Sequence, residues 1–416
     1  MVKSFKMTDR KRFQSIVVLI LVTAIAGLLI TGCKKEHDET ATTQFLKGPY
    51  LIFPDNNTQM KVLWYTNIAP GNLRIAWGKT ESCSDSNIVV TEESYSSDDM
   101  HGFNYTLTGL TPGVKTYYEV IADQNTATGS FYPAPSGNTT RLTFYGIGDS
   151  QPKTGVPAMF DAVSAALLND MNQDEPNRHT LVLHGGDFVY RGRVEGDWAA
   201  GYFNNSYTNI ASLFAAMPVM GAVGNHEFYN ANGKIDMTHP NAFIDQYLPY
   251  PYYSDYYYSF DYGPLHVAVV DNYASYEVGS DQYNWLSDDL TNSTKPWKIV
   301  MYHESGFGNA YDNKTVQTNL HPLLVSKNIK MVIQGHIHSY CRCLKDGIQY
   351  VTLVGGGAPL NAGRGPEGTY NPALIQKDAF VFHFGRFDLV DNKIDATIID
   401  KDGNIIDSFS CSSTIK

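Results

Sequence analysis

Five short polar segments, each directly following a run that predicts a β-strand, constrain the fold of this chain most strongly. They are the segments 148–149, 186–190, 224–227, 300–303 and 335–338. In an α/β sheet, functional side chains gather in the loops at the carboxyl ends of the strands. We therefore expect the segments to meet at one place, with Gly148, Gly186 and Gly335 allowing the sharp bends that aim the neighbouring side chains.

The side chains in these segments form a donor set that suits metal ions. They comprise two carboxylates, a phenol, an amide and three imidazoles: Asp149, Asp187, Tyr190, Asn225, His303, His336 and His338. One segment alone has an ordinary structural explanation, since a Gly-Asp pair is usually a turn and a His-x-His pair can be two core histidines. Unpaired Asp and His side chains that face one another would stay unsatisfied unless a metal ion held them. The ordered set therefore predicts a metal centre.

The patterns around these segments predict two domains. From residue 140 to 410, strand patterns alternate with helical ones, as at Phe160, Val163 and Leu167, which indicates an α/β fold built as a layered β-sheet sandwich flanked by helices. Between residues 47 and 135, short alternating apolar segments separated by turns predict a small all-β sandwich.

The N-terminus has the pattern of an export signal. Basic residues between positions 3 and 12 precede an uncharged run from 16 to 30, which is too short for a bilayer, since spanning one takes about 20 residues. The run ends in Leu29-Ile30-Thr31-Gly32-Cys33, which resembles a bacterial lipobox, whose cysteine is acylated. This predicts a lipoprotein signal peptide at 1–32, a polar tether at 33–46, and anchoring to the bacterial envelope in the periplasm or at the cell surface. The alternative is an ordinary signal peptide with a chance cysteine.

Replacing Cys33 by serine is expected to release the protein from the membrane, because the acyl chains that would hold a soluble domain at a bilayer are attached to this residue. Membrane and soluble fractions of cells that make either form provide the measurement. A variant that stays in the membrane fraction as firmly as the parent would show that the lipobox interpretation is wrong.

Charge and cysteine content bear on three other features: nucleic-acid binding, disulfide bonds and a zinc-thiolate site. The formal net charge is −11 without a basic block, so a nucleic-acid-binding face that works by counterion release is excluded. After Cys33, four cysteines remain at positions 83, 341, 343 and 411, and they could pair in three ways. Cys341 and Cys343 look like half of a zinc-thiolate site, but no second pair completes it. The disulfide state stays open.

The five segments, in this order, resemble the calcineurin-like metallophosphoesterases and, more narrowly, the purple acid phosphatases. The resemblance runs from about residue 48 to residue 408 and includes a fibronectin type III-like corner at 105–118. It implies a fibronectin type III-like domain before the phosphoesterase domain. Tyr190 carries the narrower resemblance. The wider superfamily has Asp-x-His in the first segment, whereas Asp149-Ser150-Gln151 lacks that histidine. The phenolate of Tyr190 can take the place of the missing histidine as a metal ligand.

This resemblance implies a role for each donor. The first metal, expected to be Fe(III), would be held by Asp149, Tyr190 and His338, with Asp187 bridging. The second, a divalent Zn, Mn or Fe ion, would be held by Asn225, His303 and His336. His226 would be the catalytic residue, donating to a phosphate oxygen or to the leaving alkoxide, while Glu227 only orients the turn.

Several residues depart from the family or have another explanation. Plant members carry adjacent histidines after the fourth segment where this chain has Tyr311-Asp312-Asn313, so that general-acid element is absent or replaced, with His321 as a candidate. Residue 151 is a glutamine where glycine is usual, and Cys341 stands where glutamate often occurs. The remaining histidines of apolar segments, His184, His266 and His383, are expected to be core or supporting residues. The tyrosine-rich run 252–262 is expected to pack in the core, with substrate contact as the alternative.

The function expected from these features is that of an acid phosphatase, which hydrolyses phosphomonoesters with a metal-bound hydroxide at two metal ions. One alternative is a phosphodiesterase acting on nucleotides or phosphorylated glycans. Another, from a different class, is a noncatalytic surface binding protein. The natural substrate, the identity of the second metal and the oligomeric state stay open.

Overall fold

The computed structural model describes residues 42–153, 155–238 and 241–413, and the chain from Thr43 onward forms one compact unit. The predicted signal peptide, Cys33 and most of the tether lie outside the described residues. The first strand begins at Phe45, two residues before the predicted start of the first domain. None of the helices in the described ranges combines the length and apolar character needed to cross a membrane.

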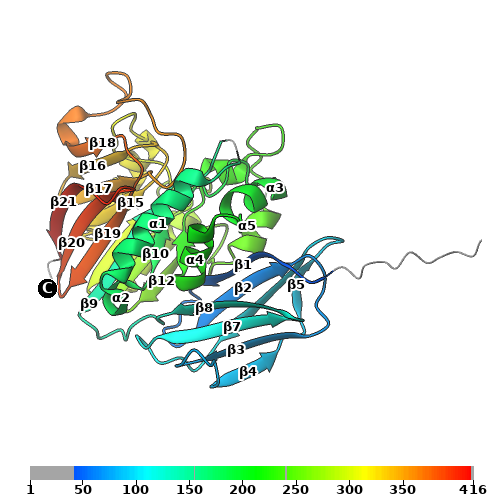
Figure 1. Ribbon diagram of the computed structural model, residues 1–416. Helices are drawn as coiled ribbons and strands as arrows, with labels where there is room; N and C mark the ends of the chain where they lie inside the picture. Colours follow the sequence, from blue (N-terminus) through cyan, green and yellow to red (C-terminus); the bar gives the residue numbers. More distant parts are fainter. Residues whose placement is uncertain (1–41, 154, 239–240, 414–416) are drawn as a thin grey trace, which may run out of the picture. The chain divides into compact units, whose positions relative to one another are not determined.

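The N-terminal region consists of two antiparallel four-stranded sheets (Figure 1). One has the order β1 (Phe45–Ile52), β2 (Met60–Thr66), β6 (His101–Leu107), β5 (Glu93–Ser96), and the other β4 (Ser86–Val89), β3 (Leu73–Gly78), β7 (Thr116–Ala122), β8 (Asn125–Phe131). Alternate residues of a strand point to opposite faces, and Val62 and Trp64 of the first sheet share one core with Ile75 and Val120 of the second. The predicted all-β region is confirmed.

The remainder of the chain is built on two larger sheets. The six-stranded sheet has the order β11 (Val219–Gly221), β10 (Val182–His184), β9 (Arg141–Ile147), β19 (His383–Val390), β20 (Lys393–Asp400), β21 (Ile405–Ser412). The seven-stranded sheet has the order β12 (Tyr258–Tyr262), β13 (Leu265–Val269), β14 (Trp297–Met301), β15 (Met331–Gln334), β17 (Ile348–Leu353), β16 (Tyr340–Lys345), β18 (Ile375–Ala379). Strands β9 to β11 are parallel, and so are β13, β14, β15 and β17.

The helices lie between these strands in the sequence. They are α1 (Ala158–Asn172), α2 (Glu175–Arg178), α3 (Glu195–Asp197), α4 (Thr208–Ala216), α5 (Ala242–Tyr247), α6 (Asp281–Asn292) and α7 (His321–Ser326). Short 3₁₀ turns span Asn225–Phe228 and Pro372–Leu374, and π-helical turns span Trp198–Tyr202 and Val316–Leu320. Phe160, Val163 and Leu167 of α1 are all buried, as their helical spacing predicts.

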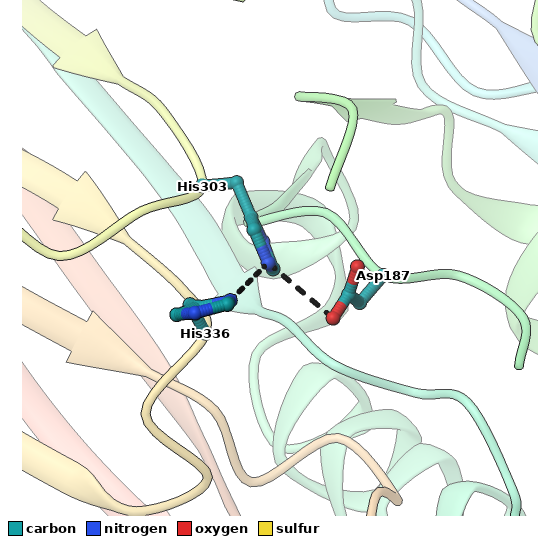
Figure 2. A group of neighbouring side chains, drawn as sticks. All are labelled: Asp187, His303 and His336. Atoms are coloured by element: carbon teal, nitrogen blue, oxygen red, sulfur yellow. Dashed lines mark hydrogen bonds and ion pairs between the residues drawn. The ribbon is translucent and has the colours of Figure 1, made fainter. Parts of the chain in front are cut away.

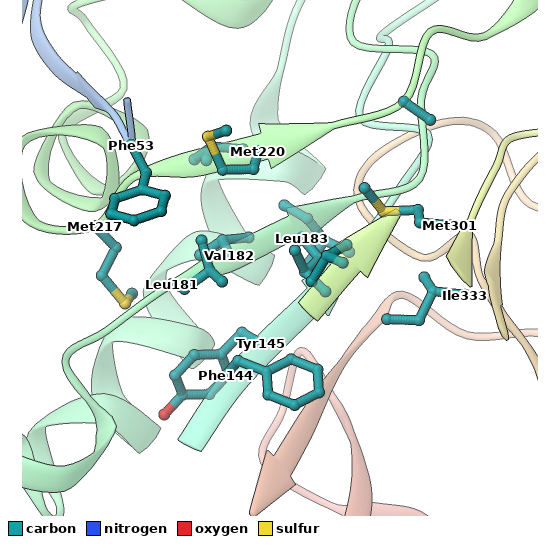
Figure 3. Close-up of a cluster of buried hydrophobic side chains, with 14 of the residues drawn as sticks. Phe53, Phe144, Tyr145, Leu181, Val182, Leu183, Met217, Met220, Met301 and Ile333 are labelled. Atoms are coloured by element: carbon teal, nitrogen blue, oxygen red, sulfur yellow. The ribbon is translucent and has the colours of Figure 1, made fainter. Parts of the chain in front are cut away.

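Apolar side chains fill the space between the two large sheets (Figure 3). Phe144 and Leu183 of the six-stranded sheet belong to the same buried cluster as Met301 and Ile333 of the seven-stranded sheet. Val300 and Val332, which alternate with these residues, join Leu286 of α6 and Leu324 of α7 in a second cluster. The predicted layered sheet sandwich flanked by helices is confirmed.

The tyrosine-rich run forms less strand than the alternation predicts. Strand β12 begins only at Tyr258, while Tyr256 lies before it and its hydroxyl accepts a hydrogen bond of 2.7 Å from the backbone N–H of Asn241. Tyr258, Phe260 and Tyr262 are almost fully buried, so this part of the run packs into the core, whereas Tyr253 is exposed.

Candidate metal centre

The carboxyl ends of five parallel strands bring the predicted donor side chains together. Asp149, Asp187 and Asn225 follow β9, β10 and β11, whereas His303 and the segment 336–338 follow β14 and β15 of the other sheet. Two sets of donor atoms result, each within 4.8 Å of one another: Asp187, His303 and His336 form the His303 group, and Asp149, Asp187 and His338 form the Asp149 group. Asp187 belongs to both, as the resemblance implies for a bridging ligand.

In the His303 group, the nitrogen atoms of two imidazoles and an oxygen atom of Asp187 face one another (Figure 2). His303 Nε2 lies 3.1 Å from His336 Nδ1, 3.3 Å from Asp187 Oδ2 and 3.3 Å from Asn225 Oδ1. Because His303 Nδ1 donates a 2.8 Å hydrogen bond to the Gly185 carbonyl, Nε2 of the neutral ring carries no proton. Acceptor atoms this close repel one another unless a proton or a metal ion lies between them, and this set of nitrogen and oxygen donors fits a metal ion.

The Asp149 group has the same character. Asp149 is fully buried, and its Oδ2 accepts no hydrogen bond from the described residues. This oxygen lies 3.4 Å from His338 Nε2, while His338 Nδ1 donates a 2.7 Å hydrogen bond to the Pro359 carbonyl. An unpartnered buried carboxylate oxygen beside an unprotonated imidazole nitrogen again fits a metal ion.

The pKa values show how strongly burial and neighbouring charges perturb these groups. Burial raises the pKa of Asp149 well above its usual value, and burial together with His303 lowers the pKa of His336 to about 3. Burial also opposes the charge on His303, but the neighbouring Asp187 carboxylate outweighs this and raises the pKa of His303 to about 10. Two positive metal ions would stabilise both carboxylates and take up the imidazole lone pairs.

The backbone of the ligand turns differs from the sequence-based expectation. Of Gly148, Gly186 and Gly335, only Gly186 has a positive φ, at 95°. The predicted ligands themselves adopt the left-handed conformation: Asp149 (φ 52°), Asp187 (57°), His336 (76°) and His338 (38°). Gly148 and Gly335 are needed for close approach instead, since a Cβ would lie 2.7 Å from the Leu353 carbonyl oxygen and 2.6 Å from that of Gly185, respectively. Left-handed non-glycine residues are costly, and their clustering at one place is typical of a functional site.

Glu227 holds two of these turns in place. Its buried carboxylate accepts hydrogen bonds from the backbone N–H groups of Gly224 (2.7 Å), Asp187 (2.9 Å) and Phe188 (2.8 Å). Burial raises the pKa of Glu227 to about 8, although two of these bonds act against the shift. The contacts join the turn after β10 to the turn after β11, which is the orienting role that the sequence predicts.

His226 and Tyr190 lie next to each other. His226 Nδ1 donates a 2.6 Å hydrogen bond to the backbone carbonyl of Tyr190, and its backbone N–H donates to Asp187 Oδ1 at 2.8 Å. The two rings are 5.2 Å apart. Tyr190 also lines a cavity of about 320 Å³ together with Lys153 and Arg191. The structure thus places the backbone of His226 against the Asp187 carboxylate and the ring of Tyr190 against the ring of His226.

Gln151 is a residue of this site that the sequence marks only as a departure from the family. Its Nε2 donates a 3.1 Å hydrogen bond to Asp187 Oδ2 and lies 3.5 Å from His338 Nε2. The side chain is 1% exposed, and its Oε1 has no hydrogen-bond partner among the described residues. The available signal was its position two residues after Asp149, where the superfamily has a histidine.

The histidines expected to be core or supporting residues all have protein partners. His184 Nε2 lies 3.1 Å from Ser150 Oγ, His266 bridges two aspartates at 2.9 and 2.8 Å, and His383 Nδ1 donates to the Val381 carbonyl at 2.8 Å.

His321, by contrast, does not fit the role of the missing general acid. Its Nδ1 is 2.6 Å from the Tyr350 hydroxyl and its Nε2 is 2.9 Å from Asp346 Oδ2. Both nitrogens are thus engaged at the start of α7, and the suggestion that His321 replaces the plant histidines is wrong.

The four cysteines of the described residues are free thiols. Cys341 and Cys343 are buried with their sulfur atoms 3.7 Å apart.

Comparison with known proteins agrees with this geometry. The family model of calcineurin-like phosphoesterases matches residues 142–340. Purple acid phosphatase 18 of Arabidopsis thaliana is 26% identical over 213 residues, which cover 45% of this chain and 46% of that protein. Fe(3+)-Zn(2+) purple acid phosphatase 12 of the same plant is 26% identical over 306 residues, which cover 68% of this chain and 61% of that protein. The chain thus spans about half to three fifths of the length of these two relatives.

A solved structure shows the same fold. The structure of purple acid phosphatase PPD1 from yellow lupin (Lupinus luteus) seeds superimposes with a TM-score of 0.68 at 17% identity, covering 88% of this chain and 74% of that chain.

Proposed function

We propose that this chain, whose residues 142–340 form a calcineurin-like metallophosphoesterase domain, is a binuclear phosphohydrolase of the purple acid phosphatase type that acts on phosphomonoesters. The observation that carries the proposal is the sharing of Asp187 between two donor groups, one of which holds the buried Asp149 Oδ2, an oxygen without a hydrogen-bond partner among the described residues. Two-metal sites of this kind suit in-line displacement at phosphorus.

The residues of the two groups would hold different ions. Asp149, Tyr190 and His338 would bind Fe(III), while Asn225, His303 and His336 would bind a divalent Zn, Mn or Fe ion, with Asp187 shared. Oxygen donors suit the harder Fe(III), and imidazoles suit the divalent ion. The similarity of this chain to Fe(3+)-Zn(2+) purple acid phosphatase 12 of Arabidopsis thaliana supports this pair. When bound, such ions supply Lewis-acid polarisation of the phosphoryl group and lower the pKa of water.

His226 would place and protonate the substrate. Its Nδ1–H is committed to the Tyr190 carbonyl, so Nε2 is the ring atom left to donate a proton. The backbone bond from His226 to Asp187 fixes the position of this ring relative to the shared carboxylate. His226 is therefore suited to donate to a phosphate oxygen or to the leaving alkoxide.

Metal analysis combined with a substrate comparison tests the proposal. Purified protein should contain two metal ions per chain and hydrolyse 4-nitrophenyl phosphate faster than bis(4-nitrophenyl) phosphate. A preference for the diester would favour the phosphodiesterase alternative. Protein without bound metal and without hydrolysis of either ester would favour a noncatalytic surface binding protein.

Tyr190→Phe is expected to remove visible colour from the protein. A phenolate bound to Fe(III) transfers electron density to the metal under visible light, so oxidised protein with Tyr190 as ligand should be pink to purple, whereas imidazole ligands give no such band. The variant loses one oxygen and little volume, so folding should survive. Visible absorption spectra of both proteins at equal iron content provide the measurement, and a colourless wild-type protein that is fully active with two divalent ions would contradict the role of Tyr190.

We further propose that the protein is exported and anchored to the bacterial envelope through Cys33. The basic N-terminus, the short apolar run and the lipobox-like sequence support this location.

A further inference from the structure

We propose that Gln151 is an additional ligand of the first metal site, binding through its side-chain amide oxygen alongside Asp149, Asp187 and His338. The proposal rests on the proposed binuclear function, since it requires a metal ion in the Asp149 group. It concerns a residue to which the resemblance assigns no ligand role, at the position where the superfamily has a histidine and this chain has a glutamine.

The backbone fixes Gln151 beside the shared carboxylate. The N–H groups of Asp149 and Ser150 donate hydrogen bonds of 2.9 and 3.0 Å to the carbonyls of Gly186 and Asp187. Ser150 Oγ also donates to the Phe188 carbonyl at 3.0 Å. The turn after β9 is therefore bonded along the turn after β10, and the next side chain, that of Gln151, enters the centre.

The end of the Gln151 side chain lies among the donor atoms of the Asp149 group. Its amide nitrogen is 3.1 Å from Asp187 Oδ2 and 3.5 Å from His338 Nε2, which are donor atoms of two predicted ligands of the first metal. The residue is 1% exposed. A buried amide this close to two metal donors is within reach of the same ion.

Electrostatics decides which end of the amide faces that ion. With no cation present, the NH₂ group donates to Asp187 Oδ2, which is the orientation in the structure. A metal ion at the Asp149 group repels the NH₂ group and attracts the amide oxygen, a hard donor that suits Fe(III). Rotation of the amide by half a turn exchanges the two atoms. Since Oε1 accepts no hydrogen bond from the described residues, the rotation gives up only the contacts of Nε2 with Asp187 and His338.

A second role is possible for the same geometry and makes a different prediction. If Gln151 only donates a hydrogen bond to Asp187, a carboxylate at this position would repel Asp187 and weaken the site. If it is a ligand, a carboxylate would bind the metal at least as well as the amide. The sign of the change in metal affinity on Gln151→Glu therefore separates a ligand from a positioning residue.

The experiment measures metal affinity by chelator competition, independently of activity. Relative to wild type, Gln151→Leu should weaken the first site, and the 10- to 100-fold found for lost partners at metal sites is the order of magnitude expected. Gln151→Glu should bind with equal or higher affinity. Gln246→Leu is the matched control. Like Gln151, Gln246 has one buried amide atom without a hydrogen-bond partner among the described residues, in this case Nε2, but it is not among the donor groups, so the metal affinity of this variant should stay at the wild-type value.

Each outcome has a consequence. Unchanged affinity in Gln151→Leu, or reduced affinity in Gln151→Glu, overturns the proposal while leaving the binuclear centre intact. If Gln151→Leu fails to fold, the comparison of Gln151→Glu with wild type decides alone. Wild-type protein that binds no metal ion refutes the proposed function itself, and so is distinguished from a failure that concerns only Gln151.

Discussion

Asp187→Asn is expected to empty both metal sites and to lower phosphatase turnover by about 10³-fold or more. In the proposed function the two metal ions would supply several kcal/mol of transition-state stabilisation, and each ~1.4 kcal/mol corresponds to a factor of ten in rate. Asp187 is the donor common to the two groups, so its loss affects both ions. Metal content by elemental analysis and turnover of 4-nitrophenyl phosphate are the two measurements.

The hydrogen bonds of Asp187 explain why asparagine at this position should fail to bind the metal ions. The backbone N–H of His226 requires an acceptor at the Oδ1 position, so the asparagine oxygen will occupy it. This leaves an NH₂ group at the Oδ2 position, 3.3 Å from His303 Nε2, where it cannot bind a metal. Asparagine adopts the left-handed conformation as readily as aspartate, so the φ of 57° should persist and the fold should survive.

Two further variants make this prediction specific. Asp149→Asn should lose only the first metal, because Asp149 belongs to one group. Asp161→Asn is the control outside the centre, since the Asp161 carboxylate accepts hydrogen bonds from the N–H groups of Asn209 and Ile210 at the start of α4, and it should retain both ions. Full metal content in Asp187→Asn would contradict the shared-ligand assignment.

The sequence could predict where the donors lie because that information is local. An apolar run followed by a polar turn marks the carboxyl end of a strand, and Asp149 and His303 each follow the strand end by two residues, at β9 and β14. Parallel strands then bring these ends together. The sequence could not show that β9 and β14 belong to different sheets, because strand pairing depends on contacts between distant segments.

Details that depend on tertiary contacts could not be predicted from the sequence. The glycines of the ligand turns suggested glycine bends, yet Asp149 and Asp187 themselves take the left-handed conformation, while Gly148 makes room for the Leu353 carbonyl. His321 looked available for chemistry, but the fold pairs it with Tyr350 and Asp346. In both cases the partner is a residue far away in the chain.

His226→Ala is expected to retain both metal ions and to lose activity by about 10²- to 10⁴-fold, as found when a positioned proton donor is removed. The ring of His226 is held by the backbone carbonyl of Tyr190 and contacts none of the donor atoms of the two groups, so these groups should remain complete. Elemental analysis and turnover again provide the measurement. His101→Ala, which changes a histidine of strand β6 in the N-terminal sandwich, is the control and should leave turnover unchanged.

The leaving group of the substrate shows whether His226 really supplies a proton. An alkyl alcohol must be protonated as it departs, whereas 4-nitrophenol leaves readily as the anion, so a missing proton donor should slow alkyl phosphates far more than 4-nitrophenyl phosphate. If His226 acted only by holding Asp187 through its backbone N–H, which alanine also has, neither substrate would be affected. Equal losses for the two substrates would instead indicate that Nε2 binds the phosphate oxygens, and loss of metal would show that the ring is a ligand after all.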